Sequence, residues 1–222
     1  MSLLILATAP VIIILVYVYI RDKYEKEPLG LLLKALLGGG LTIIPIVLVS
    51  GWLEGYKVYF TGFQQVGYVA FILAALVEEF FKFAVLFFLI WRNKEFNEKF
   101  DGIVYAVFIS LVFAWVANIS YVFNYGESAG YLRALTAVPA HALFGVTMGY
   151  YFSFAKFGHN KRKNINMFLA LFMPVLLHGI YDFILMSGHY MYLLLFIPFV
   201  IYLWWSGFNK MKVLSDNSKF KI

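Results

Sequence analysis

The sequence predicts an all-α membrane protein, a bundle of about seven transmembrane helices. Of its 222 residues 63% are apolar and only 14% are charged, and the mean hydropathy is +0.81. A soluble domain is about half apolar and a quarter charged. Apolar runs of roughly 20 residues, the length that crosses a bilayer, recur along the chain. We therefore expect one integral membrane domain over residues 1–222, with the lipid bilayer around it.

The expected spans follow one another with short polar connections. Residues 2–20 are apolar and lack the positive start of a cleaved signal sequence, so we expect a retained first helix. Pro28 suits the first turn of a second helix, which the glycines at 38–40 and Pro45 are expected to weaken and kink. The predicted spans are 2–20, 29–52, 67–90, 101–124, 131–156, 165–187 and 190–205.

The cationic residues lie mostly on one side of the predicted bundle. Fourteen of the 18 Lys and Arg fall after the first, third and fifth spans or in the C-terminal tail, and only Lys57 and Arg133 fall on the other side. Cytoplasmic loops are rich in Lys and Arg, so the N-terminus is predicted outside and the C-terminus in the cytoplasm. No basic stripe with interleaved aromatics lies outside the spans, so nucleic acid is not an expected partner. The chain has no cysteine, which excludes disulfides and thiolate chemistry.

The third span carries the stretch Glu78-Glu79-Phe80-Phe81-Lys82 near its centre. A charge at the centre of a bilayer costs about 2.5–3.5 kcal/mol on insertion scales, so these groups need partners and a role. Glu78 and Lys82 are four residues apart with the acid first, which favours a helical ion pair. That pair accounts for one glutamate and leaves the second unexplained.

Other unusual residues are predicted at similar depths on neighbouring spans. With a rise of about 1.5 Å per residue, Glu78 and Glu79 lie roughly 16–18 Å below the outer edge, His141 roughly 15 Å and His178 roughly 14 Å. Position 117 lies roughly 10 Å deep. His178 and Asp182 are four residues apart and share a helix face, as in a buried structural pair or an oriented imidazole. The shared depth predicts one site in the outer half of the membrane.

Two carboxylates and two imidazoles in a membrane cavity suit three kinds of chemistry. A glutamate can activate water as a general base while histidines donate hydrogen bonds or protons, which suffices for peptide-bond hydrolysis without a covalent nucleophile. Glu78, Glu79, His141 and His178 could instead bind zinc with an open water position. The alternative class is a proton- or ion-coupled carrier, in which buried acids and histidines relay protons. The chain has no Gly-x-Ser-x-Gly and no His-Glu-x-x-His motif.

These stretches resemble the motifs of the PrsW proteases, a family related to the CAAX prenyl proteases. The stretch at 78–82 is similar to the family's EExxK motif, and residues 178–182 (His-Gly-Ile-Tyr-Asp) are similar to its HxxxD motif. Residues 139–144 (Pro-Ala-His-Ala-Leu-Phe) are similar to the histidine motif that lies between them. The resemblance covers the first six predicted spans, in order and at matched depth.

The resemblance implies a membrane-embedded endopeptidase of the bacterial cell membrane. It implies the first (site-1) cut of a single-span, membrane-anchored anti-sigma factor, which leads to release of a sigma factor under envelope or antimicrobial-peptide stress. It also implies that Glu78 or Glu79 activates water and that His141 and His178 assist. Lys82 and Asp182 would orient these groups or balance their charge.

One position departs from the family pattern. Family members usually have Phe-Ala-x-x-Glu-Asn-x-x-Tyr on the fourth span, whereas residues 113–121 place Ala117 where the glutamate is expected. The following Asn118 is retained and could contribute a hydrogen bond. Position 117 is thus an expected catalytic position without its carboxylate, and the chain is expected to have reduced or no activity. A deliberate substitution is favoured over a natural variant, because the flanking residues fit the pattern.

Overall fold

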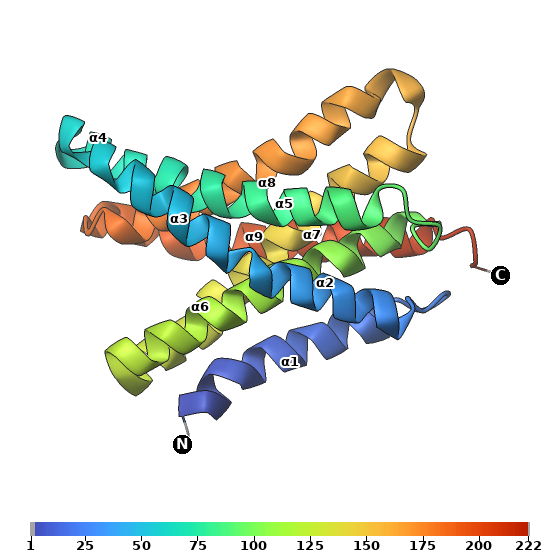
Figure 1. Cartoon of the computed structure of the whole chain (residues 1–222), viewed down its shortest axis with the longest axis horizontal. Helices are drawn as coiled ribbons and strands as arrows, with labels where there is room; N and C mark the ends of the chain where they lie inside the picture. The colour runs from blue at the N-terminus through green and yellow to red at the C-terminus, as the bar shows by residue number, and fades with distance from the viewer. Residues whose placement is uncertain (1–2, 222) are drawn as a thin grey trace.

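The computed structural model describes residues 3–221, and every regular element in that range is helical (Figure 1). The predicted all-α class is confirmed. The elements in order are α1 (Leu3–Arg21), α2 (Leu29–Leu41), α3 (Ile43–Glu54), η1 (Gly55–Tyr59), α4 (Gly62–Gly67), the π-helix η2 (Tyr68–Leu76), α5 (Val77–Ile90), α6 (Lys99–Leu135), α7 (Ala137–Phe157), η3 (Asn160–Arg162), α8 (Lys163–Met186) and α9 (Tyr190–Asp216).

Five stretches of the described chain are long and apolar enough to cross a membrane. They are Leu3–Arg21, Leu29–Tyr59, Lys99–Phe157, Asn160–Met186 and Tyr190–Asp216. The third contains both α6 and α7, which pack along each other, and the segment 62–90 with its charged motif is not among the five. The chain is therefore a multi-pass membrane protein, whereas the count of seven spans and the outward N-terminus stay predictions.

Helices α6 and α7 form the centre of the bundle. α1 and α2 cover α6, while α8 and α9 cover α7. The α6–α7 contact requires a glycine at position 149, because a Cβ there would lie 2.2 Å from the carbonyl oxygen of Gly102. Gly145 and Gly149 have the small-xxx-small spacing that allows membrane helices to approach closely. This contact fixes α7, and with it His141, against α6.

The peripheral helices expose apolar side chains rather than polar ones. Ile13 of α1, Leu37 of α2, Leu48 of α3 and Ile197 of α9 are each about two-thirds exposed. An apolar surface this extensive is unfavourable in water but suits contact with lipid tails. The bundle therefore places its polar groups inside and its apolar side chains toward the bilayer.

The helix predicted over 29–52 is interrupted at Thr42, which separates α2 from α3. Pro45 follows three residues later, and a proline ring inside a helix displaces the carbonyl four residues before it, here that of Leu41. At the break the Thr42 hydroxyl donates to the Gly39 carbonyl at 2.6 Å, and the backbone of Thr42 itself keeps helical angles. The helix is thus interrupted where it was expected to be weak, and the kink stays a prediction.

The connection between the fourth and fifth predicted spans differs from expectation. Residues 125–130 were expected to be a loop, but the structure has one non-helical residue there, Gly126, at a kink between two helical parts of α6, and the second part runs to Leu135. The Gly126 φ of 81° and ψ of −169° are accessible to glycine almost alone. α7 then begins at Ala137 rather than near 131, because Pro139 has no N–H to satisfy and so fits a first turn. His141 is consequently one turn, not ten residues, from the start of its helix.

Candidate active site

Glu78, Glu79 and Lys82 lie on α5, directly after the π-helix η2. A π-helical segment shifts the register of the residues that follow it, and such segments are frequent at functional sites. The Nζ of Lys82 lies 2.8 Å from Oε1 of Glu79 and 3.4 Å from Oε2 of Glu78. The side chains of Lys82 and Glu79 are fully buried, whereas Glu78 is 20% exposed. Both glutamates therefore contact Lys82, and Glu79 is the closer of the two.

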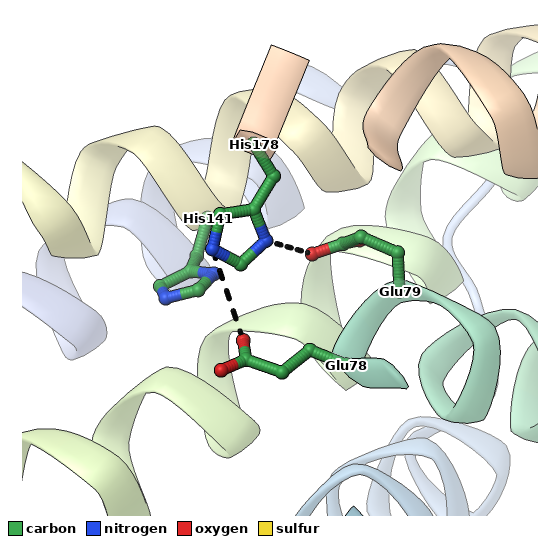
Figure 2. A group of neighbouring side chains, drawn as sticks. All are labelled: Glu78, Glu79, His141 and His178. Carbon is green, nitrogen blue, oxygen red and sulfur yellow. Dashed lines mark hydrogen bonds and ion pairs between the residues drawn. The ribbon is translucent and has the colours of Figure 1, made fainter. Parts of the chain in front are cut away.

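His178 of α8 joins both glutamates to Asp182. Its Nδ1 lies 3.0 Å from Oε1 of Glu79, and its Nε2 lies 4.0 Å from Oε2 of Glu78 (Figure 2). The same Nε2 lies 3.2 Å from Oδ2 of Asp182. Both ring nitrogens thus face carboxylate oxygens, which only accept hydrogen bonds. This arrangement favours the imidazolium form of His178, with a proton on each nitrogen.

His141 of α7 contacts both Lys82 and His178. Its Nδ1 lies 3.3 Å from the Nζ of Lys82, and its ring meets the His178 ring edge-on with centroids 5.1 Å apart. An ammonium group only donates, so Nδ1 of His141 accepts and the ring proton belongs on Nε2. His141 is therefore a neutral imidazole with one N–H to offer. Phe113 of α6 covers Lys82, whose Nζ lies 4.1 Å from the ring centre.

A cavity of about 660 Å³ opens beside this group. Glu78, His141, His178 and Asp182 line it, as does Ala117, whereas neither Glu79 nor Lys82 does. Adjacent residues on a helix point about 100° apart, so the rotation of α5 exposes one glutamate to the cavity and buries the other. Glu78 is consequently the carboxylate that a bound molecule would meet.

Asn118 does not face the glutamates. Its Nδ2 donates to the carbonyl oxygen of Ala7 in α1 at 3.1 Å, and its Oδ1 accepts from Nε of Arg133 at 3.1 Å. Both functional groups of the side chain are therefore engaged between α1, α6 and the stretch after Gly126. In this structure Asn118 joins α1 to both parts of α6, and its hydrogen bond to the site stays a prediction.

The sequence interpretation assigned no role to two further residues at the cavity. Arg133 lines its wall, and Tyr181 of α8 lines it with a buried hydroxyl group. Arg133 carried one signal in the sequence, because it is one of only two cations on the predicted outer side. Tyr181 carried none beyond its place inside the HxxxD-like stretch.

The donor atoms also fit a metal ion. One ligand atom from each of Glu78, Glu79, His141 and His178 can be chosen so that all lie within 4.8 Å of one another. Two carboxylates and two imidazoles are ligands that suit zinc, although His178 would have to release one of its two ring protons to bind it. The ammonium of Lys82 approaches three of these four side chains, so an ion would share the negative charge that Lys82 now balances.

Fold and site together define a helical, multi-pass membrane protein with an acid–base centre inside the bundle, as a membrane-embedded hydrolase requires. Residues 27–203 match the profile of a family described as PrsW family intramembrane metalloprotease. The chain belongs to this PrsW family of intramembrane proteases, and it is a multi-pass peptidase of the bacterial membrane.

Similar proteins cover nearly the whole chain. A protein named Protease PrsW from Clostridioides difficile (strain 630) is 38% identical over 224 residues, covering 99% of this chain and 94% of the relative. Protease PrsW from Oceanobacillus iheyensis is 38% identical over 218 residues, covering 98% of each. Protease PrsW from Bacillus subtilis (strain 168) is 37% identical over 205 residues, covering 92% and 91%. No solved structure matches the chain significantly.

Proposed function

We propose that the cavity is the site where a peptide bond of a membrane-anchored protein is hydrolysed, with Glu78 activating the attacking water. The observation that supports this most directly is the position of Glu78. It is the one of the two glutamates that lines the cavity, and its Oε2 lies near both Lys82 and His178. A carboxylate held this way can accept a proton from a water molecule in the cavity.

The proposed steps conserve protons at each stage. Glu78 takes one proton from water as the oxygen bonds to the carbonyl carbon, and the peptide oxygen becomes negatively charged. The Nε2–H of His141 and the positive charges of Lys82 and His178 would stabilise that oxygen. The C–N bond then breaks as Glu78 returns the proton to the departing amine nitrogen.

Glu79 is assigned a positioning role. It is fully buried, and its Oε1 holds both Lys82 at 2.8 Å and Nδ1 of His178 at 3.0 Å. Asp182 holds the other nitrogen of the same ring at 3.2 Å. Groups that orient an imidazole fix its protonation and its direction, and their loss typically lowers activity without removing a reacting atom.

A zinc ion, where present, would be held by Glu78, Glu79, His141 and His178. It would act as a Lewis acid and lower the pKa of a bound water toward neutrality. Elemental analysis of the purified protein tests this. If the protein contains one equivalent of zinc and the His178→Ala variant contains none, the ion would be assigned to these residues. Protein without stoichiometric metal would leave Glu78 as the activating group.

The substrate we propose is a single-span, membrane-anchored anti-sigma factor cut at its first site, which leads to sigma-factor activation. Membership of the PrsW family supports a membrane-protein substrate. The cavity is lined by residues on either side of the Gly126 kink in α6, such as Tyr125 and Ser128, at the end of the bundle that the cation distribution predicts to be outside. A cut on that side suits a sensor of envelope stress.

Restoring the expected carboxylate tests the function. Ala117 lines the cavity, so Ala117→Glu places a carboxylate in its wall. We expect this variant to cleave a membrane-anchored reporter in proteoliposomes, and Glu78→Gln or His178→Ala in the same background to lower the rate at least about 100-fold. Glu54→Gln, at an exposed ion pair, is the matched control and should cleave normally. Equal cleavage by all variants would refute the assignment, and proton flux without proteolysis would support a carrier instead.

A further inference from the structure

Arg133 is a cation in the wall of the cavity that no carboxylate of the described residues pairs with. It is partly buried, and no Asp or Glu oxygen of residues 3–221 forms an ion pair with it. Its Nε donates to Oδ1 of Asn118 at 3.1 Å, and its guanidinium carbon lies 3.9 Å from the centre of the Tyr121 ring. These two contacts fix the plane of the guanidinium. They also leave the four N–H groups of its two terminal nitrogens available to a ligand.

The buried hydroxyl group of Tyr181 is a second donor at the same cavity. The side chain is 4% exposed, and its oxygen has no hydrogen-bond partner within the described chain. Thr136 lies beside it and gives its own hydroxyl proton to the Leu132 carbonyl oxygen at 2.7 Å, so the Thr136 oxygen can only accept, and the Tyr181 hydroxyl makes no hydrogen bond of standard geometry to it. A buried hydroxyl without a partner costs about 1–3 kcal/mol. The Tyr181 oxygen is covered in this structure, so an acceptor atom of a bound molecule removes that cost once the cavity wall shifts to uncover it.

Apolar side chains lie beside Arg133 in this wall, together with the polar Tyr125, Ser128 and Thr136 and the carboxylate of Asp182. Ala129, Leu132, Leu185 and Met186 line it beside Arg133, on the stretch after Gly126 and on the end of α8. A carboxylate that enters beside the apolar residues is partly removed from water and meets a guanidinium, and hydrogen bonds between charged groups are stronger where less water surrounds them. The guanidinium fork matches a carboxylate with two parallel N–H···O bonds.

We propose that Arg133 and Tyr181 form a subsite that binds an acidic side chain, Asp or Glu, of the peptide substrate near the bond that is cut. This rests on the proposed function, because it assumes that a peptide occupies the cavity. Glu78 and Arg133 line the same cavity, so a peptide held at Glu78 can present a neighbouring side chain to Arg133. The subsite would select where in a substrate the cut occurs.

Peptide binding tests the subsite without requiring cleavage. The probes are fluorescent 12-residue peptides of alanine and leucine, acetylated and amidated, with a single Glu at each position in turn and matched Gln versions. They are titrated into the protein with Ala117 in uncharged detergent, and fluorescence anisotropy is measured. We expect the best Glu peptide to bind at least about 10-fold more tightly than its Gln counterpart.

Variants separate recognition from folding. Arg133→Gln should reduce the preference for Glu to below about twofold, and Arg133→Lys should keep part of it, because lysine retains the charge but not the fork. Lys57→Gln removes the other cation of the predicted outer side, which is not among the cavity's lining residues, and should leave the preference unchanged. Circular dichroism and the Tm of each variant control for folding. A preference that survives Arg133→Gln would overturn the proposal.

Two other sources of an anionic group are tested in parallel. If a Gln peptide with a free C-terminal carboxylate binds more tightly than every Glu peptide, the subsite holds the new C-terminus of the cleaved product instead. If phosphatidylglycerol in bicelles binds the protein but not the Arg133→Gln variant, and Glu and Gln peptides bind equally well, the subsite would be assigned to a lipid headgroup. Either result overturns the proposal. If Ala117→Glu fails to cleave but the Glu preference persists, the hydrolytic function fails and the subsite stands.

Discussion

Replacing Lys82 by methionine tests whether the buried charge cluster stabilises the fold. At an effective dielectric constant of about 20, Lys82 attracts Glu79 at 2.8 Å by about 6 kcal/mol and Glu78 at 3.4 Å by about 5 kcal/mol. Desolvation offsets most of this attraction. Removing one partner of a buried pair nevertheless costs about 3–5 kcal/mol, since the remaining charge stays buried. We expect Lys82→Met to lower the free energy of unfolding by that amount.

The chain offers a matched control. Lys57 and Glu54 have the same three-residue spacing and a 3.0 Å ion pair, but their side chains are 39% and 55% exposed. Exposed pairs contribute about 0–1 kcal/mol, so Lys57→Met should change the free energy of unfolding by no more than that. Unfolding in mixed micelles of dodecylmaltoside and SDS, followed by circular dichroism, measures both variants.

A double substitution shows where the cost comes from. Lys82→Met combined with Glu79→Gln removes both charges of the shortest pair, so it should be less destabilising than the sum of the two single changes by at least about 1 kcal/mol. The reasoning is refuted if Lys82→Met and Lys57→Met cost the same, or if the two changes at the buried pair are additive.

Three further predictions concern packing, pH and the positioning of His178. Gly149→Ala should destabilise by about 1–3 kcal/mol because its Cβ would meet α6, while Gly51→Ala, with no atom within 4 Å, should be neutral or slightly stabilising in the same unfolding assay. Burial and the charge of Asp101 raise the pKa of Glu27, in the α1–α2 loop, from 4.5 to about 9. The folded protein thus favours protonated Glu27, so the stabilisation that Glu27 contributes is full below pH 4.5 and is lost as the pH rises through about 9. Measurements of Tm against pH should show this decline, and Glu27→Gln should flatten it. In the Ala117→Glu background, Asp182→Asn should lower kcat about 10- to 100-fold with little change in KM, because the Nε2–H of His178 then faces a neutral amide instead of a carboxylate, and an unchanged kcat would contradict the positioning role.

Much of the fold could be predicted because transmembrane helices and their breaks depend on the hydropathy and spacing of residues that are close in sequence. The apolar runs predicted the all-helical class, and Pro45 predicted the break at Thr42, since each depends on neighbouring residues alone. The stretch after Gly126 could not be predicted, because its polar composition is typical of a loop. In the structure this stretch is helical and forms a wall of the cavity. Its conformation depends on contacts made by Arg133 and Tyr121.

The sequence by itself determined that this is a membrane protein, which residues carry unusual charge, and that His178 and Asp182 share a helix face. Burial of a charge in a bilayer is costly wherever it occurs, so Glu78, Glu79 and Lys82 required partners whatever the fold. Only the tertiary structure decided how the partners are shared. The rotation of α5 turns Glu78 toward the cavity and buries Glu79 against Lys82 and His178. That rotation is set by packing between helices, which no local spacing specifies.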